Sequence, residues 1–369
     1  MVDTGVKVRR AKFPTGSSLA LGLAISLISL IVGVDLFLNP NVSSTLLLPF
    51  TFGSAGVALL GTFAVPMLSR LKAGQIIRED GPQAHLKKQG TPTMGGIFII
   101  PVGIMLALVW SGFNDKVVAS SLLTLSFAFI GWLDDWKILR RHSNKGLSPR
   151  SKLLLQTFFS ACFCGWLALT QNWQAISTIN LPLNFVIPLG LLFFPLALFV
   201  FLGSSNATNL TDGLDGLAGG TGAIALFGMG LLLFPQNKEL SIFCMCLSGS
   251  YLGFLWHNRY PARVFMGDTG SLALGGALAS TAILGNLLWA FAIIGAIFIW
   301  ESISVIVQVT YYKSTKDETG IGKRLFKMAP FHHHLELSGW HELHVVRAFY
   351  LTGGFLVALT LLISRLAIS

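Results

Sequence analysis

The stretch FVIPLGLLFFPLALFVFLGSSN (185–206) and the stretch LAGGTGAIALFGMGLLLF (217–234) are almost wholly apolar, and they are joined through NLTDGLDGL (209–217). An apolar run of about 18 or more residues is long enough to cross a bilayer as a helix. The whole 369-residue chain has the same character, with 53% hydrophobic and 11% charged residues, whereas a soluble chain carries roughly 25% charge. The sequence therefore predicts an all-α polytopic membrane protein and excludes a soluble one.

Eleven apolar stretches are long enough to be predicted as transmembrane helices. They are 19–38, 47–69, 95–112, 117–133, 153–170, 184–203, 217–234, 240–256, 271–288, 290–310 and 347–365. The division of 271–310 is the least marked, because GNLLWAF (285–291) carries no charge, and one kinked helix is the alternative. The first stretch follows a basic start, but no A-x-A cleavage site follows it, so we expect a retained span in residues 1–44 rather than a signal peptide.

The basic residues predict the orientation of these spans, because Lys and Arg accumulate in cytoplasmic loops. If the N-terminus is cytoplasmic, 23 of the 26 Lys and Arg residues lie in predicted cytoplasmic segments or at their boundaries. The three exceptions are Lys116, Lys238 and Arg365. We therefore expect a cytoplasmic N-terminus, an external C-terminus and chemistry on the cytoplasmic side. This topology accounts for the net charge of +10, and no nucleic-acid partner is expected.

Carboxylates near membrane depth are costly and point to function. Asp134 and Asp135 end a predicted span, Asp212 and Asp215 begin one, and Asp268 precedes another. All five approach the predicted cytoplasmic surface from three segments, so they can converge, although helix capping is an alternative role for Asp212 or Asp215. Oxygen ligands of this kind suit Mg²⁺, which one or two carboxylates and substrate phosphates usually hold.

Cations lie in the same predicted loops, at Lys88, Lys137, Lys145, Arg150, Lys152, Arg259 and Arg263. Carboxylates interspersed with cations are typical of a site where metal and basic side chains neutralise phosphoryl charge. The alternative for each single cation is anchoring by the positive-inside rule. The three histidines of APFHHHLELSGW (329–340) are read as phosphate-binding or structural residues, because adjacent residues do not share one helical face for a zinc ion.

Seven motifs, in this order, resemble the polyprenyl-phosphate N-acetylhexosamine-1-phosphate transferases of glycosyltransferase family 4, and within them the bacterial phospho-N-acetylmuramoyl-pentapeptide transferases. The resemblance covers about residues 45–366. The motifs are REDGPQAHLKKQGTPTMGG (78–96), GWLDDW (131–136), KGLSPRSK (145–152), GSSNATNLTDGLDGLAGG (203–220), FLWHNRYPARVFMGDTGSLALGG (254–276), ESISVIVQ (301–308) and KRLFKMAPFHHHLELSGW (323–340).

The resemblance implies a Mg²⁺-dependent enzyme in the bacterial plasma membrane. It would move phospho-MurNAc-pentapeptide from UDP-MurNAc-pentapeptide to undecaprenyl phosphate, releasing UMP and giving lipid I. Residues 45–369 would form a single transmembrane catalytic domain with a cytoplasmic-side cleft, and a homodimer is suggested. Because the family commonly has ten spans, residues 19–38 are either an extra span or a segment at the membrane interface.

The resemblance also implies roles for individual residues. Asp268 would bind Mg²⁺, and Asp134 and Asp135 would face the lipid phosphate and the diphosphate. The family lysines of the cleft correspond to Lys88, Lys145 and Lys152. The nucleotide-side loop corresponds to Asn209, Asp212, Gly213, Leu214 and Asp215, and Phe265 would stack on uracil. The rest of the pocket corresponds to Asn258, Gln308, His332, His333 and His334.

Two other functions stay open at this point. A sister class transfers GlcNAc-1-phosphate to the polyprenyl carrier, and MAPFHHHLE (328–336) resembles it less. A cation transporter would carry acids near the middle of its spans and weakly inverted repeats, whereas the acids here cluster at the ends of spans beside cations.

Overall fold

The computed structural model describes residues 15–38, 46–70, 88, 90–141, 146–172, 176–183 and 185–366, without the side chains of 35–38. Its first helices are α1 (Gly16–Leu38), α2 (Leu47–Arg70), α3 (Gly96–Trp110), α4 (Asp115–Arg141) and α5 (Pro149–Thr170). A short hairpin of β1 (Thr178–Asn180) and β2 (Val186–Pro188) leads through η2 (Gly190–Leu192) to α7 (Phe193–Thr211). Then follow α8 (Leu217–Leu233), α9 (Lys238–Asn258), α10 (Gly267–Leu284), α11 (Leu288–Ile294), α12 (Ala296–Ser314), α13 (Phe331–Leu337) and α14 (Glu342–Leu366).

The prediction of an all-α membrane protein is confirmed. Within the described residues, seven helices are long and apolar enough to span a membrane, or eight if α11 and α12 form one span bent by 69°. Each of the eleven predicted stretches coincides with at least part of a helix, although α3, α8, α10 and α11 are shorter than 19 residues. Whether ten or eleven of them cross the bilayer stays a prediction.

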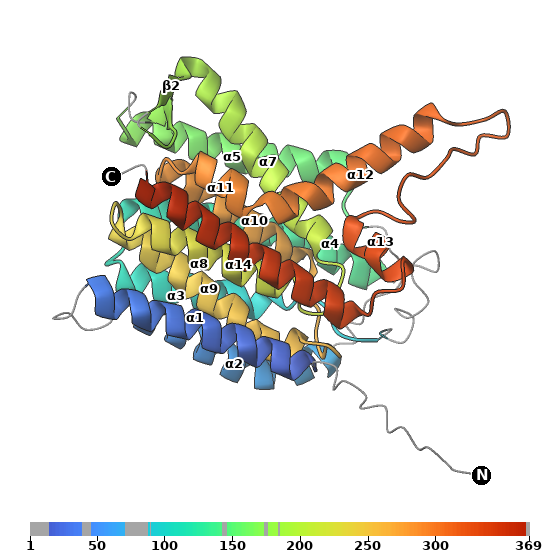
Figure 1. Ribbon diagram of the computed structural model, residues 1–369, viewed down its shortest axis with the longest axis horizontal. Helices are drawn as coiled ribbons and strands as arrows, with labels where there is room; N and C mark the ends of the chain where they lie inside the picture. The colour runs from blue at the N-terminus through green and yellow to red at the C-terminus, as the bar shows by residue number, and fades with distance from the viewer. Residues whose placement is uncertain are drawn as a thin grey trace, which may run out of the picture.

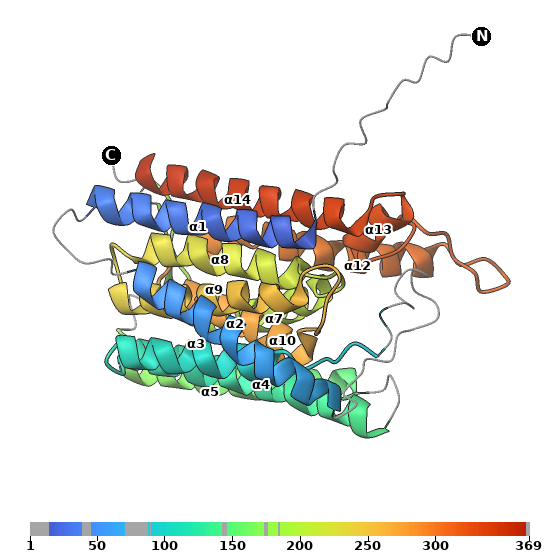
Figure 2. The ribbon, with the colours of Figure 1, turned by 90° about the horizontal axis from the view of Figure 1, so that it is seen from below.

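The centre of the bundle is built from α8, α9 and α10, whose residues are nearly all buried. Figure 2 shows α8 and α9 between a layer of α1 and α14 and a layer of α3 and α4. Glycine, alanine and serine are frequent in α8 and α10. Such small side chains let helix backbones approach closely in a bilayer, where the hydrophobic effect does not drive helices together.

The predicted span at 184–203 is wrong at its start. Residues 186–188 form strand β2, and the helix begins at Phe193. Proline at 182 and 188 disfavours a helix there, and Gly190 has φ +54°. The helix then continues to Thr211, through residues predicted as a loop, because its small polar side chains bond to α10: the Ser204 hydroxyl donates to the Gly275 carbonyl (2.8 Å) and the Thr208 hydroxyl to that of Ser271 (2.7 Å).

The first helix lies along the bundle, where it contacts α9, α2 and α8. Its N-terminal end is joined to the C-terminal end of α9, where the Arg259 Nε donates to the Ser17 hydroxyl at 2.9 Å. This packing is what an extra span would require. The predicted division of 271–310 is confirmed, because α10 ends at Leu284 and a further break at Gly295 separates α11 from α12, which leaves the bundle obliquely (Figure 1).

Candidate functional site

The acidic side chains gather at one end of the bundle because α4 packs tightly on α10. Gly131 of α4 lies against the backbone of Asp268, and a Cβ at this position would overlap the Asp268 carbonyl. One turn later on the same helix, Asp134 and Asp135 therefore meet the N-terminal turn of α10, and both are nearly buried. Because Gly131 has no side chain, α4 and α10 pack closely enough to bring Asp134 and Asp135 next to Asp268.

Asp135 holds the first turn of α10. One carboxylate oxygen accepts the Asp268 N–H (3.2 Å), and the other accepts the Thr269 N–H (3.0 Å) and the Thr269 hydroxyl (2.7 Å). Because the first N–H groups of a helix lack partners within the helix, a carboxylate from a neighbouring helix is a favourable cap. Asp135 therefore fixes the orientation of Asp268.

Lys152 joins Asp134 to Asp268. Ser148 caps α5 by accepting the Ser151 N–H (3.1 Å), and Pro149 begins the helix, which places Lys152 in its first turn. The Lys152 Nζ lies 3.5 Å from Asp134 Oδ1 and donates to Asp268 Oδ2. Asp134 also accepts the Leu147 N–H at 2.9 Å. One lysine thus links three helices at this point.

Asn209 adds α7 to the same cluster. Its Nδ2 donates to Asp268 Oδ1 (2.7 Å) and to the Ser271 hydroxyl (2.9 Å). Asp212 ends α7 as its C-cap, and burial, with added repulsion from Asp268 and Asp215, raises its pKa to about 7. We call Asp134, Asp135, Lys152, Asn209, Asp212 and Asp268 the acidic cluster.

The acidic cluster suits a cation. The cluster holds four carboxylates and one lysine, which pairs with Asp134 and Asp268. Burial is the main cause of the raised pKa of Asp212, and repulsion from Asp268 and Asp215 adds to it. Among the described residues no three His, Cys, Asp or Glu side chains form a ready metal centre. Mg²⁺ keeps waters and is held by one or two carboxylates plus substrate phosphates. Asp268, whose side chain is 24% exposed, is the carboxylate best placed to reach such a ligand.

Asp215 faces a different set of partners from those of the acidic cluster. Its Oδ1 accepts the Lys88 ammonium (2.8 Å), its Oδ2 accepts the Ala262 N–H (2.9 Å), and Lys88 also donates to Glu342 at 2.6 Å. Glu342, the first residue of α14, accepts the Asp215 N–H as well (2.7 Å). Burial by itself would lower the pKa of Lys88, but the carboxylates of Glu342 and Asp215 outweigh it and raise that pKa.

The sequence reasoning missed Glu342, because it counted this residue within a long cytoplasmic loop. The alternative that an aspartate caps α8 is wrong: its N-cap is Gly216, which has φ +82°, and no side chain caps it.

The histidines divide among separate partners. His332 and Glu301 of α12 are fully buried, with His332 Nδ1 3.1 Å from Glu301 Oε2. The His332 ring also lies against Gly213, where a Cβ would overlap Nε2. His333 Nδ1 is 2.8 Å from Glu336, and the His334 ring accepts the Lys327 N–H (3.1 Å). Of the three, His332 therefore touches the turn that follows Asp212. The motif ESISVIVQ (301–308) includes Glu301, but the sequence alone could not supply its partner.

The remaining predicted residues surround these groups. Asn258 is buried and ties the Gly216 N–H (3.0 Å) to the Val264 carbonyl (2.9 Å). Phe265 is half-buried, and its backbone bonds to Pro92 and Gly95. Leu214 packs in an apolar cluster with α14. Gln308 holds the backbone of Phe326 through both amide atoms. Lys145 lies outside the described residues.

Comparison with known proteins decides the family. The sequence matches the glycosyl transferase family 4 over residues 117–286 and the phospho-N-acetylmuramoyl-pentapeptide-transferase signature 1 over residues 88–100. It is 58% identical to the phospho-N-acetylmuramoyl-pentapeptide-transferase of Nostoc sp. over 349 residues, which are 94% of each chain. The chain belongs to the phospho-N-acetylmuramoyl-pentapeptide-transferase family.

Other members of the phospho-N-acetylmuramoyl-pentapeptide-transferase family are nearly as similar. Those of Trichormus variabilis and Microcystis aeruginosa are 58% and 55% identical, over 94% and 95% of this chain and 94% and 96% of their own. The signature region runs from Lys88 to Ile100 in α3, and the family 4 region runs from α4 to the end of α10. The two regions together contain Lys88 and every member of the acidic cluster.

Proposed function

We propose that the protein transfers phospho-MurNAc-pentapeptide from UDP-MurNAc-pentapeptide to undecaprenyl phosphate, at the cytoplasmic side of a bacterial plasma membrane. The observation that carries the proposal is the bridge from Lys152 to Asp134 and Asp268 at one end of an apolar bundle. Such a site serves a charged phosphoryl group and a lipid together. The names of relatives at 58% identity favour this substrate over UDP-GlcNAc, the alternative that the sequence left open.

Mg²⁺ is part of the proposal. Asp268 would hold it, with Asp212 close enough to share its charge, and the bound ion would offset the charge of the diphosphate. The chain's own residues do the rest of the positioning. Lys152 steers phosphoryl oxygens towards the acidic cluster, Asp135 keeps Asp268 in place, and the turn at Asp212–Asp215 lies beside the nucleotide.

We propose a direct displacement. The acceptor is a phosphate monoester with a second pKa of about 6, so it is mostly a dianion at neutral pH and scarcely needs a general base. One of its oxygens attacks the β-phosphorus, the bond from that phosphorus to the UMP oxygen breaks, and UMP leaves. Asp134 orients the acceptor and takes up its residual proton when one is present.

Two measurements test the proposal. Purified protein with undecaprenyl phosphate should release UMP with UDP-MurNAc-pentapeptide and not with UDP-GlcNAc; the reverse preference would contradict the assigned substrate. Without the lipid acceptor, UMP release should be absent. A burst of UMP equal to the enzyme concentration would instead support a double displacement, in which an aspartate takes the sugar phosphate before the lipid does. Such a burst would contradict the direct displacement.

A further inference from the structure

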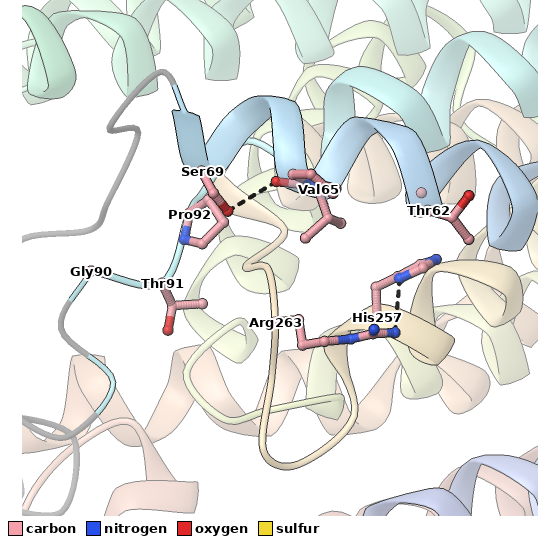
Figure 3. Close-up of a pocket in the computed structure, with 10 residues that line it drawn as sticks. Thr62, Val65, Ser69, Gly90, Thr91, Pro92, His257 and Arg263 are labelled. Carbon is pink, nitrogen blue, oxygen red and sulfur yellow. Dashed lines mark hydrogen bonds between the residues drawn. The ribbon is translucent and has the colours of Figure 1, made fainter.

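A hollow of about 570 Å³ lies apart from the acidic cluster, between the C-terminal end of α2, the segment Gly90–Pro92 and the end of α9. No member of the acidic cluster lines it. In Figure 3 the Arg263 side chain runs beneath α2 towards His257, with Val65 and Thr62 of α2 above it. Its wall is mixed in character, with apolar side chains, hydroxyl groups and this arginine.

The guanidinium of Arg263 is held in place by a histidine. His257 is 2% exposed, and its Nε2 lies 2.8 Å from the Ala58 carbonyl. A carbonyl only accepts hydrogen bonds, so Nε2 carries the hydrogen and Nδ1 is left to accept from Arg263 Nη2, at 3.2 Å. Gly61 makes room for this ring, because a Cβ there would overlap it. His257 is thus neutral and serves to orient Arg263.

The hollow carries positive charge that the described residues do not neutralise. Arg259 and Arg263 both donate to the Trp256 carbonyl. In the part of the chain that the structure describes, no carboxylate forms an ion pair with either arginine, and Arg263 Nε and Nη1 have no hydrogen-bond partner. Two cations close to one carbonyl repel each other, and an anion with oxygen acceptors would relieve this and fill the free donors.

The flank of α2 indicates where such an anion comes from. Leu59, Phe63 and Met67 recur every four residues on the neighbouring face of α2, and they are 65%, 70% and 63% exposed. Such a row of apolar side chains on a helix long enough to span is a surface for acyl chains. A basic pocket between transmembrane helices at the end of such a surface is suited to the head group of an anionic lipid.

We propose that this hollow binds the phosphate of an anionic phospholipid, with its acyl chains along Leu59, Phe63 and Met67 of α2. Arg263, oriented by His257, donates to the phosphate through a free N–H of its guanidinium, and Arg259 adds charge. The site shares no residue with the acidic cluster.

The test is binding of phosphatidylglycerol to the purified full-length protein in detergent, counted by native mass spectrometry. We expect phosphatidylglycerol to bind more tightly than phosphatidylcholine, and Arg263→Gln to weaken it about tenfold, as for loss of a charge-assisted hydrogen bond. The matched control is Arg347→Gln, an exposed arginine on α14, which should bind as the unaltered protein does. Equal binding by Arg263→Gln and the control would overturn the proposal.

A second variant keeps every charge. Gly61→Ala should displace His257 and so weaken phosphatidylglycerol binding, whereas Gly56→Ala, which meets only Val102 at 3.3 Å, should not. Inorganic phosphate in millimolar excess should fail to displace the lipid; displacement would make the ligand a soluble anion and contradict the proposal. Because bound lipid is counted without turnover, this result is separate from the assigned reaction.

Discussion

Asp268 is the residue on which the acidic cluster converges, since it contacts Lys152 and Asn209 and receives its orientation from Asp135. We expect Asp268→Asn to lower turnover by at least about 100-fold, as for loss of one group that stabilises transition-state charge. The defect should persist at every Mg²⁺ concentration while the protein remains folded. Asp115→Asn, at the opposite end of α4, is the control, and normal turnover of Asp268→Asn at saturating Mg²⁺ would refute the assignment.

Lys88 stabilises the molecule by compensating two carboxylates, so its removal should cost more than the loss of one ion pair. Breaking a largely buried pair by removing one partner costs about 3–5 kcal/mol. We expect Lys88→Met to lower the free energy of unfolding by at least this amount, measured by denaturant unfolding in micelles. The double variant Lys88→Met with Glu342→Gln should lose less free energy of unfolding than the two single variants together, because the Glu342 carboxylate is no longer left unpaired. Strict additivity would argue that Lys88 and Glu342 are not coupled.

The sequence showed which residue types belong to the site but not which residues contact one another. The five aspartates stood out because acids are rare in this chain, and four of them do meet. Asp215 does not join the acidic cluster, because Lys88 and Glu342 hold it from positions 127 residues away on either side. Contacts of that separation are set by helix packing, which no local sequence pattern encodes.

Among the elements, α13 is attached to α12 through a buried dyad of Glu301 and His332 and through the ring contact of Phe331 with Trp300. Glu301 Oε1 and His332 Nε2 have no hydrogen-bond partner in the described parts of the chain. Glu301 Oε2 therefore makes the contacts of the pair, at 3.1 Å from His332 Nδ1 and 3.5 Å from the His332 backbone N. We expect Glu301→Leu to free α13 and raise the Michaelis constant for the UDP substrate, because His332 also abuts Gly213. Glu301→Gln keeps an acceptor for Nδ1 and should restore most of the affinity.

The measurements for this dyad are steady-state kinetics with each substrate varied and hydrogen exchange of α13. Ser304→Ala removes a buried hydroxyl one turn further along α12 and should leave both unchanged. A Glu301→Leu variant with normal exchange in α13 would show that the dyad does not hold this helix.

The elements themselves were predictable where apolar length alone decides them. The prediction failed at residues 184–192 because hydropathy does not register the backbone restriction imposed by proline, or the positive φ of Leu183 and Gly190. It also ended α7 too early, because Ser204 and Thr208 look like loop residues but satisfy their hydroxyls on α10.

At the scale of the whole molecule, the orientation in the membrane is the main prediction still to be measured. The bond from Arg259 to Ser17 places the start of α1 at the same end as the last turn of α9, which suits a cytoplasmic N-terminus and an odd number of spans. A reporter protein fused after residue 369 should therefore be active only if it is of the kind that works outside the cytoplasm. Activity of a cytoplasmic reporter there would contradict the predicted orientation. A reporter fused before residue 1 separates the two span numbers, because it should work in the cytoplasm with eleven spans and outside it with ten.

The burial of α9 has a consequence for how this sequence can change over time. Nearly every residue from Leu240 to Asn258 is enclosed by neighbouring helices, while α1 shows most of its surface outwards. A lipid-facing helix accepts almost any apolar exchange, but a change in α9 alters the fit to α2, α3 or α8 at once. Substitutions in α9 should thus be tolerated mainly in pairs with these neighbours, and a library of random variants should show paired compensation there and independent drift in α1.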